Sequence, residues 1–176
     1  MTEPIRPAAT KLHGKENWIV CLAIADITTP TATEVAAGTA LDITNIAFQS
    51  GSPNPSQNTN RVTQERRFGD TVVAEFIGDT TYQGGDLTYA FGAQSASGSD
   101  GKKLWEKIPA GTTGYLVRRM GVARATAPAA GQFVDVFPVE FGPSMPTKQG
   151  DGESSEAAAV CSFAINSAPA FNKALA

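Results

Sequence analysis

Two strongly patterned segments near the end of the chain are joined by a long polar one. Residues 132–141, QFVDVFPVEF, alternate between two faces with the two-residue period of a β-strand, and residues 156–166, EAAAVCSFAIN, have the composition of another strand. Residues 142–155 between them are rich in glycine and polar side chains. We predict two strands joined by a long loop, and a loop of this length in a compact domain is usually functional or ordered by another molecule.

A strand near the start of the chain must be covered on both sides. In residues 18–25, WIVCLAIA, neither of the two alternating faces is polar, which is typical of a strand buried on both sides. Pro138 cannot donate a ladder hydrogen bond, so it predicts a sheet edge or a bulge. Gly69 and Asp70 mark a hairpin turn between two further strands. The remaining predicted strands, including those of the hairpin, cover residues 40–48, 61–69, 70–78, 87–92 and 114–124.

Two short helical segments are predicted among these strands. Thr31 and Glu34 stand at the spacing of a capping box, in which each side chain bonds the backbone N–H of the other residue. Residues 101–108, GKKLWEKI, predict a second short helix. We expect its apolar side chains to face inward: Leu104, Trp105 and Ile108.

The chain has 176 residues, enough for one domain with a real core. Many short strands and few helices predict an all-β fold, a sandwich or a partly open barrel with one or two short helices. We expect an N-terminal arm over residues 1–17, a single β-sandwich domain over 18–166 and a C-terminal arm over 167–176. Residues 49–60, QSGSPNPSQNTN, predict a second long loop.

No pattern in the chain points to an enzyme, a cofactor or a metal. The single histidine, His13, lies in the polar N-terminal arm, and the segment GSDGKKL departs from a phosphate-binding loop at two positions. Asp151 and Glu153 are too few to form a calcium loop. We therefore expect no catalytic, cofactor-binding or metal-binding residue.

The charge and the apolar runs exclude other classes of partner. The formal net charge is -3, so no global basic field attracts nucleic acid. The arginine pairs at 66–67 and 118–119 lie in predicted strands, where neighbours point to opposite faces and form no basic patch. The longest apolar run is too short to span a bilayer. Cys21 and Cys161 lie in apolar runs, as buried cysteines of a reducing compartment do.

Two longer phrases carry a resemblance to a known family. Residues 30–44, PTATEVAAGTALDIT, and residues 111–142, GTTGYLVRRMGVARATAPAAGQFVDVFPVEFG, resemble segments of the major tail tube proteins of long-tailed, siphovirus-type bacteriophages. The order and spacing of these segments agree with that family, and the resemblance covers most of the chain from residue 18 onward.

The resemblance implies a structural virion protein without enzymatic activity. Copies would form rings, usually of six, and the rings would stack into the tail tube, with strands from all copies closing one β-barrel around a channel. The implied partners are other copies of the chain, a tape-measure protein, and terminator and tail-tip proteins. Double-stranded DNA would pass through the channel without specific binding. The location would be the phage tail, assembled in the host cytoplasm, with no membrane involved.

In a tube of this kind, some residues are expected to face the lumen and others to contact neighbouring subunits. Because released counterions make basic linings adhesive to DNA, the lumen should be neutral or acidic. The candidate lumen-facing residues are Glu75, Asp135 and Glu140, with the alternative that each pairs with an arginine on a sheet surface. The two long loops and the C-terminal arm would contact other subunits. The candidate loop contacts are Pro53, Pro55, Met145, Lys148, Asp151 and Glu153, and the candidate arm contacts are Pro169 and Phe171.

Two other structural classes remain open at this stage. A carbohydrate- or receptor-binding β-sandwich would expose clustered aromatic side chains, whereas Trp18 and Trp105 both lie in apolar surroundings. A capsid decoration protein would share the β-rich composition. The symmetry of assembled particles would distinguish a decoration protein from a tube.

Overall fold

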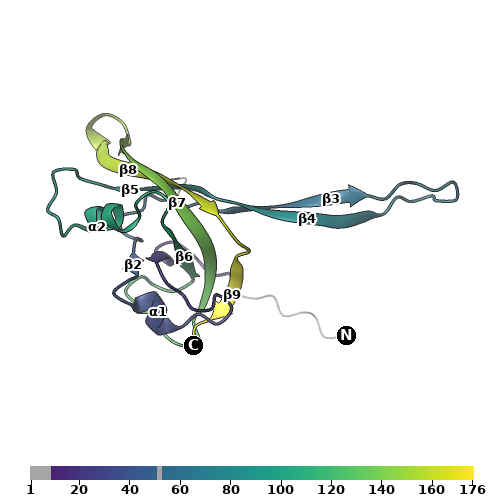
Figure 1. Ribbon diagram of the computed structural model, residues 1–176, viewed down its shortest axis with the longest axis horizontal. Helices are drawn as coiled ribbons and strands as arrows, with labels where there is room; N and C mark the ends of the chain where they lie inside the picture. The colour runs from purple at the N-terminus through teal and green to yellow at the C-terminus, as the bar shows by residue number, and fades with distance from the viewer. Residues whose placement is uncertain (1–8, 51–52) are drawn as a thin grey trace.

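The computed structural model describes residues 9–50 and 53–176. It consists of one curled seven-stranded sheet and a two-stranded hairpin that projects far from the body (Figure 1). The sheet has the order β2-β1-β6-β7-β8-β5, and β9 pairs with β7 as well. All these pairs are antiparallel, and the prediction of an all-β fold is confirmed. The strands are β1 (Glu16–Cys21), β2 (Leu41–Asp42), β3 (Ser56–Thr63), β4 (Glu75–Gln83), β5 (Gly85–Ala90), β6 (Thr113–Met120), β7 (Phe133–Gln149), β8 (Glu156–Ile165) and β9 (Ala170–Ala174).

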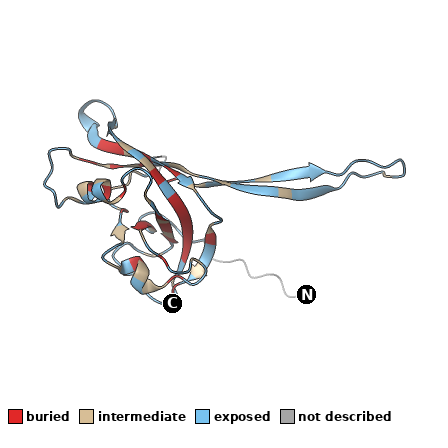
Figure 2. Ribbon diagram, in the orientation of Figure 1, coloured by how far each residue is buried: buried red, intermediate tan, exposed pale blue. Residues whose placement is uncertain are grey.

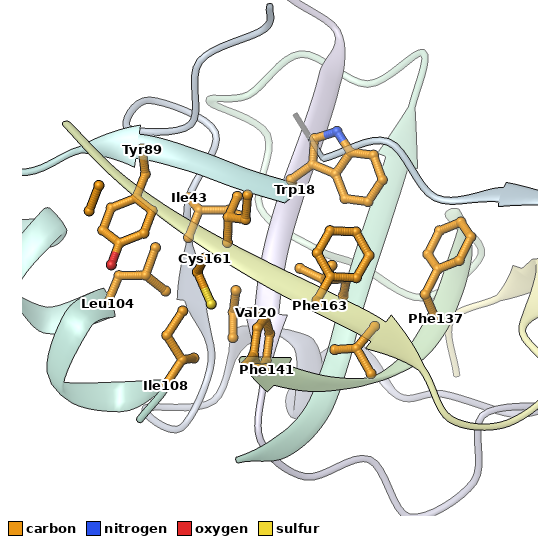
Figure 3. Packing of buried hydrophobic residues seen from close by; sticks show 14 of the residues in the cluster. Trp18, Val20, Ile43, Tyr89, Leu104, Ile108, Phe137, Phe141, Cys161 and Phe163 are labelled. Carbon is orange, nitrogen blue, oxygen red and sulfur yellow. The ribbon is translucent and has the colours of Figure 1, made fainter. Parts of the chain in front are cut away.

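Apolar clusters lie on both faces of the sheet. One face packs against α2 (Asp100–Lys107) and the segment around Ile43, and its centre holds Val20, Leu116 and Phe141 (Figure 3). The other face packs against α1 (Ala32–Ala36) and the C-terminal residues, with Ile19 and Val117 in its centre. The predicted burial of both faces is therefore confirmed for residues 18–21, but the predicted strand over 18–25 is too long, because β1 ends at Cys21 and Ala23 and Ala25 are exposed. The cover comes from the chain itself rather than from neighbouring copies.

Both predicted helices form, and their local chemistry is as expected. The Thr31 hydroxyl accepts a hydrogen bond from the Glu34 N–H at 3.2 Å, and the Glu34 carboxylate accepts one from the Thr31 N–H at 2.9 Å. The same carboxylate accepts a bond from the Ala25 N–H at 2.8 Å, which ties α1 to the segment after β1. In α2, Leu104 is fully buried, and Trp105 stacks on the ring of a neighbouring phenylalanine.

The predicted loop over residues 142–155 is wrong in its first half. Strand β7 continues to Gln149 and pairs with β8 in register from Ser144–Cys161 to Gln149–Glu156, after a bulge that follows Phe141. Only residues 150–155 turn the chain, through the short 3₁₀ segment Gly152–Ser154. Gly150 and Gly152 have φ of +80° and +60°, which other residues adopt only with strain. The backbone ladder thus forms where the side chains show no apolar pattern.

The predicted hairpin forms, with its strands further from the tip than expected. β3 begins at Ser56, inside the predicted loop over 49–60, and pairs with β4 from Ser56–Gln83 to Thr63–Glu75. The chain reverses over residues 64–74, so the predicted centre at Gly69 is confirmed. The parts of β3 and β4 nearest the body, residues 56–59 and 80–83, were not predicted as strands because their side chains are mostly polar on both faces.

The two chain ends differ from one another. Residues 167–176 were expected to form an arm, but β9 pairs with β7, and the buried Leu175 exchanges hydrogen bonds with residues 131–132. At the other end, residues 9–15 are exposed, and β1 begins at Glu16. The part of the expected N-terminal arm before residue 9 lies outside the described residues.

Pro138 lies in an interior strand, so the prediction of a sheet edge is wrong. It pairs with Tyr115 of β6, and its carbonyl accepts a hydrogen bond from Asn166 on the other side of β7. On that side, the partner of β7 changes from β9, whose first residue lies opposite Val136, to β8, whose last residue lies opposite Val139. The missing N–H therefore falls in the gap between two partner strands, where no ladder bond is lost.

Candidate assembly surfaces

The β3–β4 hairpin is the largest exposed element of the molecule. Both of its strands are almost wholly exposed along their length (Figure 2). An isolated two-stranded hairpin is at best marginally stable in water, because it has no second layer to pack against. A hairpin of this length is therefore expected to be covered by another molecule.

The hairpin changes in character along its length. Its proximal half is polar, with Thr59 opposite Thr80. A bulge then places Gly78 and the residue after it against one residue of β3. Beyond the bulge, apolar side chains appear among charged ones, and Val62 pairs with Phe76 across the strands. The exposed apolar side chains of this distal half are Val62, Phe68, Val72, Val73, Phe76 and Ile77. Such a concentration of exposed apolar side chains marks a contact surface.

Aromatic rings fix the base of the hairpin to the body. Tyr82 of β4 lies 6.2 Å from the ring of Phe171, which meets Phe137 edge-on at 5.7 Å. Gly84, between β4 and β5, lies so close to the backbone of β8 that a Cβ there would collide with the Phe163 carbonyl. Phe171, a predicted arm contact, thus packs within its own subunit. The hairpin therefore leaves the body in a defined direction.

Asp135 does not present a free carboxylate. It is 8% exposed, and one of its oxygens accepts hydrogen bonds from the Arg118 guanidinium at 3.0 and 3.1 Å. The other oxygen accepts the Asn172 N–H at 2.8 Å. Asp135 therefore pairs with an arginine, which was the predicted alternative to a place in the lumen. Arg118 also lies 5.6 Å from the centres of the Trp18 and Phe137 rings.

The second arginine of the pair is buried on its own. Arg119 is 3% exposed and donates to the Gln132 side chain at 2.9 Å and to the Thr126 carbonyl at 2.7 Å. Burial lowers the pKa of this guanidinium. Arg118 and Arg119 therefore have separate partners and make no basic patch, as predicted from their places in a strand. The other predicted pair, Arg66 and Arg67, lies outside β3 and β4 in the segment that reverses the chain, so the prediction of a strand is wrong for that pair.

A second surface is the uncovered part of the curled sheet, over β5, β8 and the end of β7. We call it the acidic face, and it is defined by Asp86, Ser162, Ala164, Glu140, Met145 and Thr147. The Ser162 hydroxyl donates to the Asp86 carboxylate at 2.6 Å, and Glu140 pairs across the strands with Ala164. These strand positions include two carboxylates and no lysine or arginine.

The structure separates the three predicted lumen residues. Glu140 lies on the acidic face, Asp135 is paired with Arg118, and Glu75 lies at the far end of β4, opposite Thr63 on the hairpin. Asp86 was missed as a candidate. The alternation of Asp86 with the buried Leu87 and Tyr89 in β5 was the signal that could have found it.

The remaining predicted contacts are divided between surface and interior. Met145 is 61% exposed. Lys148 and Asp151 are also exposed, and the Lys148 Nζ lies 3.6 Å from the Asp151 Oδ1 at the end of the β7–β8 hairpin. Glu153 is exposed in the same turn. Three prolines are less available to a partner: Pro53 is buried, and Pro55 and Pro169 are half-buried.

The described residues contain no group of three or more side chains suited to a metal ion. Over the same residues, no helix is long and apolar enough to cross a membrane. Cys21 and Cys161 are buried free thiols, as predicted, and burial raises the pKa of Cys21 to about 12.

Comparisons with known proteins agree with a tail component. A family model described as phage tail tube protein matches residues 4–176. Among curated proteins, none matches. One similar solved structure comes from the cryo-EM structure of the anti-feeding prophage (AFP) baseplate, 6-fold symmetrised. It has 10% sequence identity and a TM-score of 0.51, and the match covers 98% of each chain. At this identity, the likeness shows a shared fold.

Proposed function

Because this chain belongs to the phage tail tube protein family, we propose that its copies close into rings and that the rings stack into the tube through which the genome leaves the capsid. The protein is a structural component of the virion tail. The proposed role is mechanical, without a catalytic step. The β3–β4 hairpin carries this proposal, because its distal apolar side chains have no cover within the subunit.

The ring is proposed to contain six copies. The similar baseplate structure is described as 6-fold symmetrised, which supports this number by analogy of fold. The proposed partners are other copies of the chain, a tape-measure protein inside the growing tube, and terminator and tail-tip proteins at its ends. The β7–β8 hairpin end, with Lys148 and Asp151, is proposed as a further contact between subunits. Met145 belongs to the acidic face instead.

We further assign the acidic face to the channel. A lining of small side chains with Asp86 and Glu140 would let DNA pass, because carboxylates repel phosphates and release no counterions from DNA. Asp135 is left out of this lining because Arg118 neutralises it. Glu75 is assigned to the contact made by the hairpin rather than to the channel.

Negative-stain electron microscopy of the purified chain at high concentration tests the proposed assembly. We expect rings or tubes with a central hole. If only monomers form, the grid is repeated with the tape-measure and tail-tip proteins present. Monomers in that second experiment would refute the tube.

A charge-reversal series tests the channel assignment. We expect tails carrying Asp86→Lys and Glu140→Lys to assemble normally but to eject DNA poorly, because the lysines would hold the phosphates. Glu106→Lys, at an exposed position of α2 outside the acidic face and outside the proposed contacts, is the matched control and should leave ejection unchanged. Normal infectivity of the double variant would show that this face does not line the channel.

A further inference from the structure

We propose that the tip of the β3–β4 hairpin of one copy seats in a cavity at the base of the same hairpin in a copy of the next ring. This inference rests on the proposed tube and identifies the surface that receives the hairpin. Both parts of the contact are present in each subunit.

The hairpin tip is held in shape by its own hydrogen bonds. The Arg67 N–H donates to the Asp70 carboxylate at 2.9 Å, the Asp70 N–H returns a bond to the Arg67 carbonyl at 3.0 Å, and the Arg66 Nε donates to the Asp70 carbonyl at 3.1 Å. This ordered turn leaves Phe68 completely exposed. Within the described part of the chain, neither guanidinium is ion-paired. The tip is therefore a preformed aromatic knob flanked by two cations.

The cavity has the size and chemistry to receive this knob. Its volume is about 560 Å³, and its lining includes the apolar Leu12 and Trp18 together with Glu16 and Arg124. The Trp18 indole N–H donates to one Glu16 oxygen at 3.2 Å, which holds that carboxylate at the cavity. Among the described residues, its other oxygen has no hydrogen bond and can accept one from a cation. A phenylalanine ring is complementary to Leu12 and Trp18, and a guanidinium to the Glu16 carboxylate. Arg124, the cation of this lining, is paired with Asp42 at 3.6 Å.

The positions of tip and cavity favour contact between successive copies. Asn54, which precedes β3 by two residues, lines the cavity, so tip and cavity lie at opposite ends of one hairpin. The run from Ser56 to Phe68 spans roughly 40 Å at about 3.3 Å per residue. A shift of one copy by this length along the hairpin brings its cavity to the tip of the previous copy. Such a contact joins two different surfaces, so it repeats without closing, as stacked rings require.

Covalent crosslinking within assembled tubes tests the contact. Gly69→Cys places a thiol beside Phe68 without removing it, and a Cβ at Gly69 meets nothing within 4 Å. Asn45→Cys places a thiol in the cavity lining, where Asn45 is exposed. The matched control combines Gly69→Cys with Ala96→Cys in the exposed loop before α2, at the end of the body away from the hairpin (Figure 1). Because both native cysteines are buried, a short bis-maleimide reports on the introduced pair.

We expect Gly69→Cys/Asn45→Cys tubes to give a ladder of covalent oligomers that extends beyond the number of copies in one ring. The control should remain monomeric. If tubes form but the Asn45 variant crosslinks no more than the Ala96 control, the hairpin tip docks elsewhere, while the tube itself stands. A ladder that stops at the size of one ring would place the contact within rings and overturn the axial direction. Absence of tubes from the unsubstituted chain with its tail partners would instead refute the proposed function.

Discussion

Replacing Phe76 with threonine tests whether the distal hairpin contributes binding energy to assembly. Phe76 lies beyond the bulge of β4, pairs with Val62 and is 56% exposed in the single subunit. Threonine is β-branched, which strands favour, and it removes the aromatic ring. We expect the variant subunit to fold normally, because the lost cross-strand pair contributes only about 0.2–1 kcal/mol.

The effect on assembly follows from the area that remains to be covered. A phenylalanine side chain buries roughly 200 Å², so the exposed 56% of Phe76 corresponds to about 110 Å². At about 25 cal/mol per Å², covering this area stabilises a contact by about 2.8 kcal/mol. Threonine retains a methyl group, which leaves a difference of about 2 kcal/mol per contact. That difference lowers the association constant roughly 30-fold.

The measurement is the critical concentration for tube formation, determined by sedimentation and confirmed by electron microscopy. We expect Phe76→Thr to raise it roughly 30-fold. Phe133→Thr is the matched control, since Phe133 is 55% exposed but lies at the start of β7 on the body. An equal rise in both variants would show a general loss of apolar surface rather than a hairpin contact. No rise in Phe76→Thr would refute the role of the distal hairpin.

Four further predictions concern the subunit alone. Phe141→Ala opens the centre of one apolar cluster and should lower the free energy of unfolding by about 3–5 kcal/mol in urea titrations. Thr31→Ala should cost about 1 kcal/mol through the lost helix cap. Hydrogen bonds from the Ala25 and Thr31 N–H groups lower the pKa of Glu34. At pH values above the ordinary glutamate pKa of about 4.3, the wild-type chain should therefore have a larger free energy of unfolding than Glu34→Gln. This difference should vanish as the pH falls through the lowered pKa of Glu34. Because burial raises the pKa of Cys21, its thiol should not react with a thiol reagent at about pH 8 until the protein unfolds.

The sequence predicts strands well where one face packs on a core. β1, β6, the first half of β7 and β8 carry that signature, because burial imposes apolar residues at alternating positions. The capping box of α1 was predictable for a different reason, since two side chains three residues apart complete their own hydrogen bonds. In each case the cause lies within a short segment.

The elements that were missed depend on partners elsewhere in the chain or in other copies. The end of β7 and the base of the hairpin are polar on both faces, and their strand geometry comes from backbone pairing with β8 and with each other. For Asp135, a place in the channel and pairing with an arginine both stayed open, because nothing near it in sequence shows Arg118, which lies opposite it in the β6–β7 register. Asp86 was not a candidate because the face that it shares with Ser162 and Glu140 forms only when three strands come together.

Asp135 also permits a test of what holds the base of the hairpin. Its two oxygens have separate tasks: one binds Arg118 above the Trp18 and Phe137 rings, and the other accepts the N–H of Asn172. Asn172 has a φ of +52°, in the left-handed region, so this bond fixes the irregular backbone in the middle of β9, where its register with β7 shifts.

Two substitutions separate the tasks of this carboxylate. Asp135→Asn removes the charge and keeps an oxygen for Asn172, so it should lower the free energy of unfolding by about 1.5–3 kcal/mol. Asp135→Ala also leaves the Asn172 N–H without its partner, which should cost roughly a further 1–3 kcal/mol. Denaturant unfolding measures both values, and hydrogen exchange at Asn172 should rise only in the alanine variant. Equal costs in the two variants would mean that the bond to Asn172 contributes nothing, and that the Asp135 side chain stabilises the subunit through its ion pair with Arg118.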